Sequence, residues 1–382
     1  MAEPIPPAPI NGVCPPKFQA VREAFAANFA THGDVGASVA ITIDGELVVD
    51  LWGGFKDLGR TTPWARDTIV GVASTTKTMT ALCALLLADR GELDLDAPVA
   101  RYWPQFAAAG KEGVLVRHCL GHTAGLPGFT APMVFADFYD WEKVTGLLAA
   151  QAPWWTPGTA SAYHAVTQGF LVGEVIRRIT GQSLGTFFRR ELAEPLGGDF
   201  LIGVEAKDDH RIAGTIPNPV PEPDQGDITT MWGRIALNPR IPADREPDVR
   251  WLRSEIPAAN GYSNARGVAT IQSLLACGGE VRGRRLMSEA GCRAALRQQS
   301  DFVDLGWLFP VRWAMGYALS LGGLSFGPDT CFWGGNGGSL IVVDFGRRMT
   351  FAYTMNKAVG APFGDPRNAT LVAATYAALS QA

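Results

Sequence analysis

A serine and a lysine stand three residues apart in the segment Gly71-Val-Ala-Ser74-Thr-Thr-Lys77-Thr-Met79. The apolar spacing that follows predicts a helix over Ser74 to Arg90, so both side chains face the same side of its first turn. A serine hydroxyl becomes an effective nucleophile when a neighbouring base takes its proton, and burial can lower the pKa of a lysine enough for that role. The same spacing also fits an N-capping serine followed by a solvated lysine, so the wider sequence must decide.

Further blocks accompany this pair in a fixed order along the chain. They are Arg90-Gly-Glu-Leu-Asp-Leu-Asp-Ala-Pro98-Val, Gly121-His-Thr-Ala-Gly-Leu-Pro127, Pro157-Gly-Thr-Ala-Ser-Ala-Tyr163 and Trp333-Gly-Gly-Asn-Gly-Gly-Ser339. The ordered set resembles the serine β-lactamase and penicillin-binding-protein superfamily, and within it the class C β-lactamase-like esterases known as family VIII carboxylesterases. The resemblance extends from about Gly36 to Asn356.

The resemblance implies a role for each motif residue. Ser74 is expected to be the acylated nucleophile and Lys77 its base, while Tyr163 relays protons to the leaving group and to the deacylating water. The backbone N–H groups of Ser74 and Asn336 would form the oxyanion hole. The substrate-binding strand would carry Trp333, Gly334 and Gly335, whose glycines permit a close approach.

Two departures from the superfamily pattern concern charge and hydrogen bonding. Trp333 occupies the position of the lysine in the K-T-G block, so a cation that would attract substrate carboxylates is absent. The block Tyr163-His164-Ala165 also lacks the asparagine of Y-x-N. Both changes favour neutral esters. We assign His164 to substrate binding, with a rim or packing histidine as the alternative.

The implied function is a serine carboxylesterase that hydrolyses short-chain or small aromatic esters through an acyl-enzyme on Ser74. The alternatives are a weak β-lactamase, a DD-peptidase-like amidase, an acyltransferase, and a non-catalytic ligand-binding protein. The aromatic residues that are candidates for the acyl pocket, with core packing as the alternative, are Trp154, Trp155, Phe129, Phe135 and Trp232.

A second serine pattern, Gly323-Leu-Ser325-Phe-Gly327, matches the G-x-S-x-G nucleophile elbow of α/β-hydrolases. That elbow needs a helix after the serine and a histidine later in the chain. No histidine follows Ser325, and strand-like runs flank it. We therefore predict a hairpin loop there.

The remaining patterns predict where regular structure lies. Strands concentrate at both ends of the chain and helices in its middle, which indicates an α/β (α+β) fold of β-lactamase-like type: an antiparallel sheet flanked by helices, with an inserted all-α region. We place the α/β domain at residues 1–90 plus 260–382 and the inserted helical domain at 91–259. The proline-rich stretch Pro217–Pro257 is predicted to lack regular structure and to be a candidate cleft wall, with a surface insertion as the alternative. The predicted elements are helices over 16–31, 144–150, 167–180, 265–277 and 366–380, a hairpin around Asp44-Gly45, and strand runs over 312–321, 339–345 and 349–356.

Composition limits the partners and the compartment. The 382 residues are 47% hydrophobic and 18% charged with a net charge of −4, which predicts a folded core and no electrostatic footprint for nucleic acid or an anionic membrane. The six cysteines have no metal-ligand spacing and are expected to be reduced core thiols. With no signal-like or membrane-spanning segment, we expect a cytoplasmic enzyme acting on a small-molecule ester without cofactor or metal.

Overall fold

The computed structural model describes residues 8–217, 227–242, 248–359 and 364–380. Its main feature is a sheet in which every neighbouring pair of strands is antiparallel, as predicted. The strands, in sheet order, are β1 (Ile10–Val13), β3 (Glu46–Gly54), β2 (Gly36–Ile43), β14 (Met349–Met355), β13 (Leu340–Asp344), β12 (Thr330–Gly334), β11 (Ala318–Leu321), β10 (Pro310–Trp313) and β9 (Ser300–Val303).

The two ends of the chain meet in the centre of this sheet. β14 pairs with β2 along its whole length, from Met349 opposite Ile43 to Met355 opposite Ala37. β2 and β3 are joined at Asp44 (φ 51°) and Gly45 (φ 79°), both in the left-handed region that a type I′ turn requires. The predicted hairpin is therefore confirmed, and its turn chemistry explains the register.

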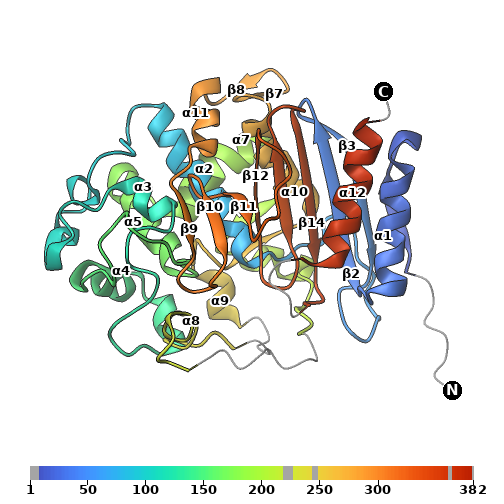
Figure 1. Cartoon of the computed structure of the whole chain (residues 1–382). Helices are drawn as coiled ribbons and strands as arrows, with labels where there is room; N and C mark the ends of the chain where they lie inside the picture. The colour runs from blue at the N-terminus through green and yellow to red at the C-terminus, as the bar shows by residue number, and fades with distance from the viewer. Residues whose placement is uncertain (1–7, 218–226, 243–247, 360–363, 381–382) are drawn as a thin grey trace.

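Helices cover both faces of the sheet. α1 (Gln19–Thr31) and α12 (Pro366–Ser380) pack together on one face, and α10 (Ala265–Ala276) packs against β14, β2 and β13 (Figure 1). Successive side chains of β13 therefore point to opposite faces of the sheet. Leu340 and Val342 belong to the core beneath α1, whereas Ile341 and Val343 belong to the core that contains α10. The sheet is buried on both sides.

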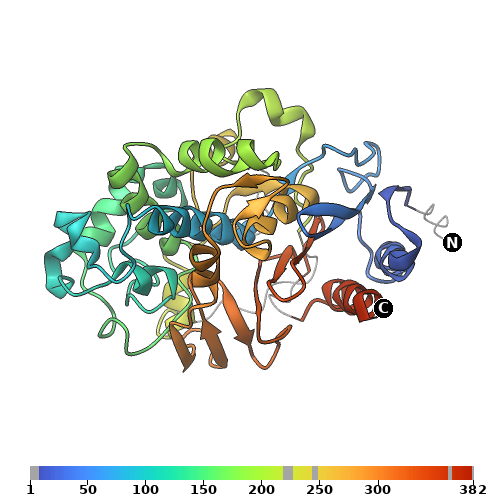
Figure 2. The ribbon, with the colours of Figure 1, turned by 90° about the horizontal axis from the view of Figure 1, so that it is seen from above.

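Most of the remaining helices gather at one end of the sheet, beyond β9 and β10 (Figure 1, Figure 2). Among them, α2 (Thr76–Asp89) packs against α5 (Thr167–Thr180). The other α-helices among the described residues are α3 (Val116–Leu120), α4 (Trp141–Ala150), α6 (Leu184–Phe188), α7 (Glu194–Leu196), α8 (Met231–Ala236), α9 (Val249–Arg253) and α11 (Glu289–Arg293). The minor strands are β4 (Val70–Gly71), β5 (Phe200–Ile202) and β6 (Gly261–Ser263) in one small sheet, and β7 (Glu280–Val281) with β8 (Arg284–Arg285) in another.

Short 3₁₀ and π turns complete the connections, namely η1 (Pro16–Phe18), η2 (Ala73–Thr75), η3 (Val99–Arg101), η4 (Pro104–Gly110), η5 (Phe135–Tyr139), η6 (Arg189–Ala193), η7 (Ala206–Arg211) and η8 (Ala294–Leu296). One apolar core joins α2 and the helices between residues 116 and 204 to α10. The division at residues 90 and 260 stays a prediction.

Two predictions of secondary structure were wrong. The proline-rich stretch 217–257 contains α8 and α9, each begun by a side-chain cap: Thr230 accepts from the Gly233 N–H and Asp248 from the Trp251 N–H. The prolines of the stretch lie outside both helices, and residues 218–226 and 243–247 lie outside the described ranges. The run 312–321 is not one strand but parts of β10 and β11, which pair with each other.

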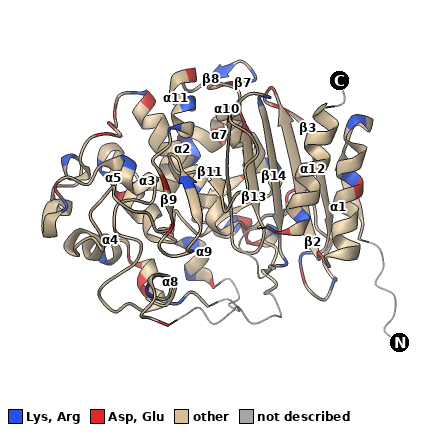
Figure 3. Cartoon of the chain, in the orientation of Figure 1, with Lys and Arg blue, Asp and Glu red and all other residues tan. Residues whose placement is uncertain are grey.

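The expected core thiols are confirmed, since none of the six cysteines is in a disulfide and all but Cys14 are buried. Charged side chains of both signs are spread over the elements of the fold (Figure 3). None of the helices that the structure describes has both the length and the apolar character that a membrane span would need.

Candidate active site

The turn that carries Ser74 joins β4 to α2 and is tied to the end of β12. Ala73 has φ 45°, a left-handed conformation that L-residues other than glycine seldom adopt, so other contacts must maintain the turn. The Ser339 hydroxyl supplies them: it donates to the Val72 carbonyl at 2.8 Å and lies 2.9 Å from Thr75 Oγ1. Ser74 itself remains partly exposed. A strained turn thus presents its hydroxyl to solvent.

Lys77 lies one helical turn further on and is fully buried. Its Nζ is 3.2 Å from Ser74 Oγ, 2.6 Å from the Ala165 carbonyl oxygen and 2.9 Å from the Ala258 carbonyl oxygen. Burial lowers the pKa of Lys77 well below its usual value. A neutral amine has two N–H donors for the two carbonyls and one lone pair to accept the serine proton, which matches these three partners.

Tyr163 is the third motif residue brought to this point. Lys77 Nζ lies 4.7 Å from the centre of its ring. Burial raises the pKa of the phenol. The structure therefore brings Ser74, Lys77 and Tyr163 together, with a neutral phenol at ordinary pH.

The position of Asn336 follows from the glycine before it. A side chain on Gly335 would lie 2.3 Å from the Val72 carbonyl oxygen and 3.1 Å from Ala73 Cβ, so only glycine allows the end of β12 to meet the nucleophile turn. The sequence assigned this glycine to close approach of substrate, but its nearest neighbour is the protein's own backbone. Within the described ranges, neither Ser74 N–H nor Asn336 N–H donates to a protein acceptor. Both remain candidates for the oxyanion hole.

His164 has a different role from the one assigned to it. Its side chain is fully buried; Nδ1 is 2.7 Å from the Ala162 carbonyl oxygen, and Nε2 accepts from the Leu126 N–H at 3.2 Å. Burial lowers the pKa of His164 to about 3, so the ring is neutral. With both nitrogens bonded to backbone, His164 offers none to a substrate. It is a packing histidine, the alternative that the sequence left open.

His122, which the sequence analysis quoted only within a motif, packs against the same residues. It is buried, with φ 58°, and its Nδ1 accepts from the His164 N–H at 3.1 Å. Its ring centre lies 5.0 Å from that of Tyr163 and 4.2 Å from that of Trp313. Burial lowers the pKa of His122, with contributions from His164 and Lys77, so it adds no charge beside the lysine.

Trp333 belongs to an aromatic cluster around Tyr163, which we define as Tyr163, Trp307, Trp313 and Trp333. The ring centres of Trp307, Trp333 and Trp313 lie 4.6, 5.2 and 5.9 Å from that of Tyr163. Trp333 is only 2% exposed, so its ring supports the tyrosine more than it faces solvent. No sequence motif indicated Trp307 or Trp313, because their roles depend on the sheet register that brings β10 and β12 close to residue 163.

Asp304 is a further residue that the sequence did not indicate. It is fully buried, and its Oδ1 accepts from the backbone N–H groups of Gly306 (2.9 Å) and Trp307 (3.1 Å). Burial raises the pKa of Asp304 to about 6, although the hydrogen bonds from the Trp307 and Gly306 N–H groups oppose the shift. This carboxyl group therefore orders the loop that carries Trp307.

The aromatic residues named as candidates for the acyl pocket divide into separate locations. Phe129 and Phe135 both pack against Phe138 in the apolar core, which is the core-packing alternative that the sequence left open. Trp155 packs on His164. The Arg234 guanidinium carbon lies 3.8 Å from the ring centre of Trp154. Trp232 on α8 is the one that approaches the aromatic cluster, 6.1 Å from Trp307. Ser325 lies exposed between β11 and β12, in the predicted hairpin loop.

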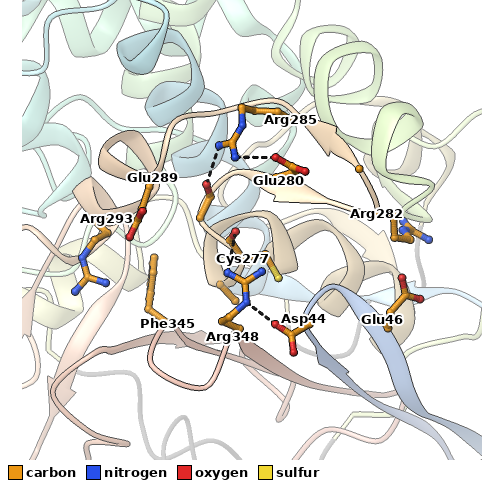
Figure 4. A pocket seen from close by; sticks show the side chains of 13 residues that line it. Asp44, Glu46, Cys277, Glu280, Arg282, Arg285, Glu289, Arg293, Phe345 and Arg348 are labelled. Atoms are coloured by element: carbon orange, nitrogen blue, oxygen red, sulfur yellow. Dashed lines mark hydrogen bonds and ion pairs between the residues drawn. The ribbon is translucent and has the colours of Figure 1, made fainter.

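A polar hollow of about 530 Å³ lies elsewhere and contains none of these residues. Four arginines and four carboxylates line it, and Figure 4 shows Arg285 directed at Glu280 (2.7 Å) and Arg348 at Asp44. Burial raises the pKa of Cys277 at its wall. This hollow offers no activated nucleophile. Among the described residues, no group of three or more His, Cys, Asp or Glu side chains is arranged so that it could bind a metal ion.

Comparison with known proteins agrees with this geometry. The family described as Beta-lactamase matches residues 21–376. The chain is 35% identical over 320 residues to the esterase/beta-lactamase LipL of Mycobacterium tuberculosis, a match that covers 81% of this chain and 74% of LipL. A crystal structure of a family VIII carboxylesterase superposes with a TM-score of 0.91 at 41% identity, covering 97% of this chain and all of the other. A penicillin-binding protein homolog from Caulobacter crescentus gives 0.91 at 39% identity, with the same coverage.

The fold and the serine–lysine pair define a serine hydrolase. The protein belongs to the beta-lactamase family. Its fold is β-lactamase-like, as the sequence predicted, and its structural neighbours include family VIII carboxylesterases and penicillin-binding protein homologs.

Proposed function

We propose that this protein is a carboxylesterase that hydrolyses neutral short-chain or small aromatic esters through an acyl-enzyme on Ser74. The observation that carries the proposal is the environment of Lys77: a buried amine 3.2 Å from the serine hydroxyl, with two carbonyl acceptors and with burial, not a neighbouring charge, as the cause of its lowered pKa. The lowered pKa favours the neutral amine, which is the form that accepts a proton.

Acylation begins when the Ser74 proton moves to Lys77 Nζ and Oγ attacks the ester carbonyl carbon. The carbonyl oxygen becomes an oxyanion, for which the N–H groups of Ser74 and Asn336 are the proposed donors. The tetrahedral intermediate then expels the alcohol oxygen, which takes a proton from the Tyr163 hydroxyl as Tyr163 recovers one from the Lys77 ammonium. The products of this half-reaction are the free alcohol and the Ser74 ester.

Deacylation repeats these steps with water in place of the serine hydroxyl. Lys77 and Tyr163 take a proton from water, the hydroxide oxygen attacks the acyl carbon, and Ser74 Oγ leaves with that proton. The overall change is ester plus water to carboxylic acid plus alcohol. No further reagent is needed for this balance.

The preference for neutral esters is proposed from residue 333. Trp333 is buried against Tyr163 where the superfamily pattern has a lysine, so this position supplies no cation for a substrate carboxylate. Relatives named esterase and carboxylesterase support the same choice.

Burst kinetics test the proposal. Wild type, Ser74→Ala and the matched control Ser325→Ala are mixed with p-nitrophenyl acetate, p-nitrophenyl butyrate and nitrocefin. We expect turnover of both esters by wild type and Ser325→Ala, little turnover of nitrocefin, and no burst with Ser74→Ala. Equal ester hydrolysis by wild type and Ser74→Ala would refute the assignment, and nitrocefin turnover exceeding that of the esters would favour the β-lactamase alternative.

The acyltransferase and ligand-binding alternatives make different predictions for the same ester substrates. An acyltransferase gives more transfer product than acid when an alcohol is added, and a ligand-binding protein gives no burst. A cytoplasmic location remains a prediction from the sequence.

A further inference from the structure

The loop between β9 and β10 carries an aromatic side chain to the edge of the proposed site. Trp307 is half-buried, and its ring centre lies 4.6 Å from that of Tyr163 and 6.1 Å from that of Trp232 on α8. Phe309 stacks on Trp307, with the ring centres 5.6 Å apart and an interplanar angle of 13°. Tyr163 is buried, whereas Trp307, Trp232 and Phe309 are each partly exposed. An aromatic surface thus leads outward from the tyrosine.

The loop is fixed at several points. Asp304 accepts from the Gly306 and Trp307 N–H groups, the Leu308 N–H donates to the Asp304 carbonyl at 2.8 Å, and the Leu305 N–H donates to the Ser161 carbonyl at 2.8 Å. The last bond joins the loop to the segment that carries Tyr163. Trp307 is therefore held in position before any ligand arrives, which reduces the entropy lost on binding.

We propose that Trp307 is a specificity-determining residue that binds the planar ring of an aromatic alcohol group in the ester substrate. This inference rests on the proposed function. The leaving alcohol oxygen must reach the Tyr163 hydroxyl to be protonated, and Trp307 packs against that same tyrosine. A planar group one or two bonds from the alcohol oxygen meets the indole, whereas the acyl group lies beyond the carbonyl carbon, on the other side of the ester oxygen.

The test compares two acetates that differ only in aromaticity, benzyl acetate and cyclohexylmethyl acetate. For wild type we expect the larger kcat/KM with benzyl acetate. Trp307→Leu should lower the benzyl to cyclohexylmethyl ratio by about 2- to 10-fold, mainly through KM, and Trp307→Phe should retain most of it. Trp52→Leu, which removes a half-buried tryptophan from β3 near the opposite edge of the sheet, should leave the ratio unchanged.

A second pair of esters, ethyl phenylacetate and ethyl cyclohexylacetate, places the aromatic or saturated ring in the acyl group instead of the alcohol group. We expect its ratio to be the same in wild type and Trp307→Leu. A measurement on wild type alone adds a check independent of folding: benzyl alcohol should inhibit more strongly than cyclohexylmethanol by a similar factor.

The inference is wrong if the acetate ratio is unchanged in Trp307→Leu, if the acyl-side ratio falls instead, or if the two alcohols inhibit equally. In each of these outcomes wild type still hydrolyses esters and Ser74→Ala does not, so the proposed function survives. If wild type hydrolyses none of the four esters, both fail.

Discussion

Lys77 Nζ lies 3.2 Å from Ser74 Oγ, and the two other atoms within hydrogen-bonding distance of it are backbone carbonyl oxygens, at Ala165 and Ala258. These two acceptors belong to segments far from α2 in the chain. The lysine is therefore oriented by backbone from outside its own helix. With its two N–H groups donated to these carbonyls, the neutral amine would have its lone pair left for the serine proton.

The pH dependence of acylation follows from this arrangement. Because burial lowers the pKa of Lys77, the neutral base is available at a lower pH than for an ordinary lysine, and kcat/KM should fall as pH decreases through that lowered pKa. Lys77→Met should lower kcat/KM by at least about a hundredfold. The measurement is kcat/KM for p-nitrophenyl acetate from pH 5 to 10. Activity of Lys77→Met within tenfold of wild type would show that another group is the base.

Tyr163→Phe removes only the hydroxyl and keeps the ring among its tryptophan neighbours. Because the neutral phenol is the proposed proton donor to the leaving alcohol, we expect kcat/KM for alkyl esters to fall by about 10²- to 10⁴-fold. The control is Tyr353→Phe, which removes another buried hydroxyl, one that donates to Asp34. Circular dichroism should show lower thermal stability for the control, with kcat/KM near that of wild type. Similar kinetics for the two variants would contradict the role of Tyr163.

Asp304 should make the fold less stable as pH rises. Its pKa is raised to about 6 in the folded protein from an ordinary value of 3.8, so between these values the folded state binds more protons than the unfolded state. The free energy of unfolding therefore decreases with pH, by about 1 kcal/mol between pH 5 and 7.5 from this group. Urea unfolding of wild type and Asp304→Asn across that range measures it.

The informative quantity is the difference between the two proteins, in which other titrating groups cancel. Wild type should lose stability relative to Asp304→Asn as pH rises. A difference that is constant with pH, or one that changes in the opposite direction, would show that the carboxyl group is not held at a raised pKa.

Trp333→Lys tests whether the absence of a cation at residue 333, where the superfamily pattern has a lysine, determines the preference for neutral esters. A lysine there should raise the nitrocefin to p-nitrophenyl acetate ratio of kcat/KM by about tenfold, the value of one hydrogen bond to a charged group. Trp333→Met is the control, since it removes the indole without adding charge. Because Trp333 is only 2% exposed, both variants should lose absolute activity through poorer support of Tyr163. An equal ratio in the two variants would refute the charge argument.

Local sequence chemistry was sufficient for several elements. Asp44-Gly45 determines its own turn because both residues adopt positive φ, and the apolar spacing after Pro366 gave both ends of α12. The order of the motif blocks likewise predicted that Ser74, Lys77 and Tyr163 meet. Each of these predictions depends either on neighbours in the chain or on a pattern shared with a family.

Contacts between distant segments could not be predicted in this way. Asp304 acts through a loop bonded to Ser161, and no motif marks a carboxylate whose partners are backbone N–H groups. His164 was assigned to substrate binding, with a packing histidine as the alternative, and only the fold shows that its two ring nitrogens are bonded to backbone at Ala162 and Leu126. The many prolines of 217–257 led to the prediction of irregular structure. Each of the short helices α8 and α9 nevertheless fits between prolines and begins at a side-chain cap.

The central claim is that Ser74 forms a covalent acyl-enzyme, and the most direct test is the mass of a trapped adduct. Wild type, Ser74→Ala and Ser325→Ala are each treated with an alkyl p-nitrophenyl phosphonate, and the intact mass and the modified peptide are determined. We expect one phosphonyl group per chain, located on Ser74, in wild type and Ser325→Ala, and none in Ser74→Ala. A full adduct on Ser74→Ala, or an adduct mapped to Ser325, would contradict the account.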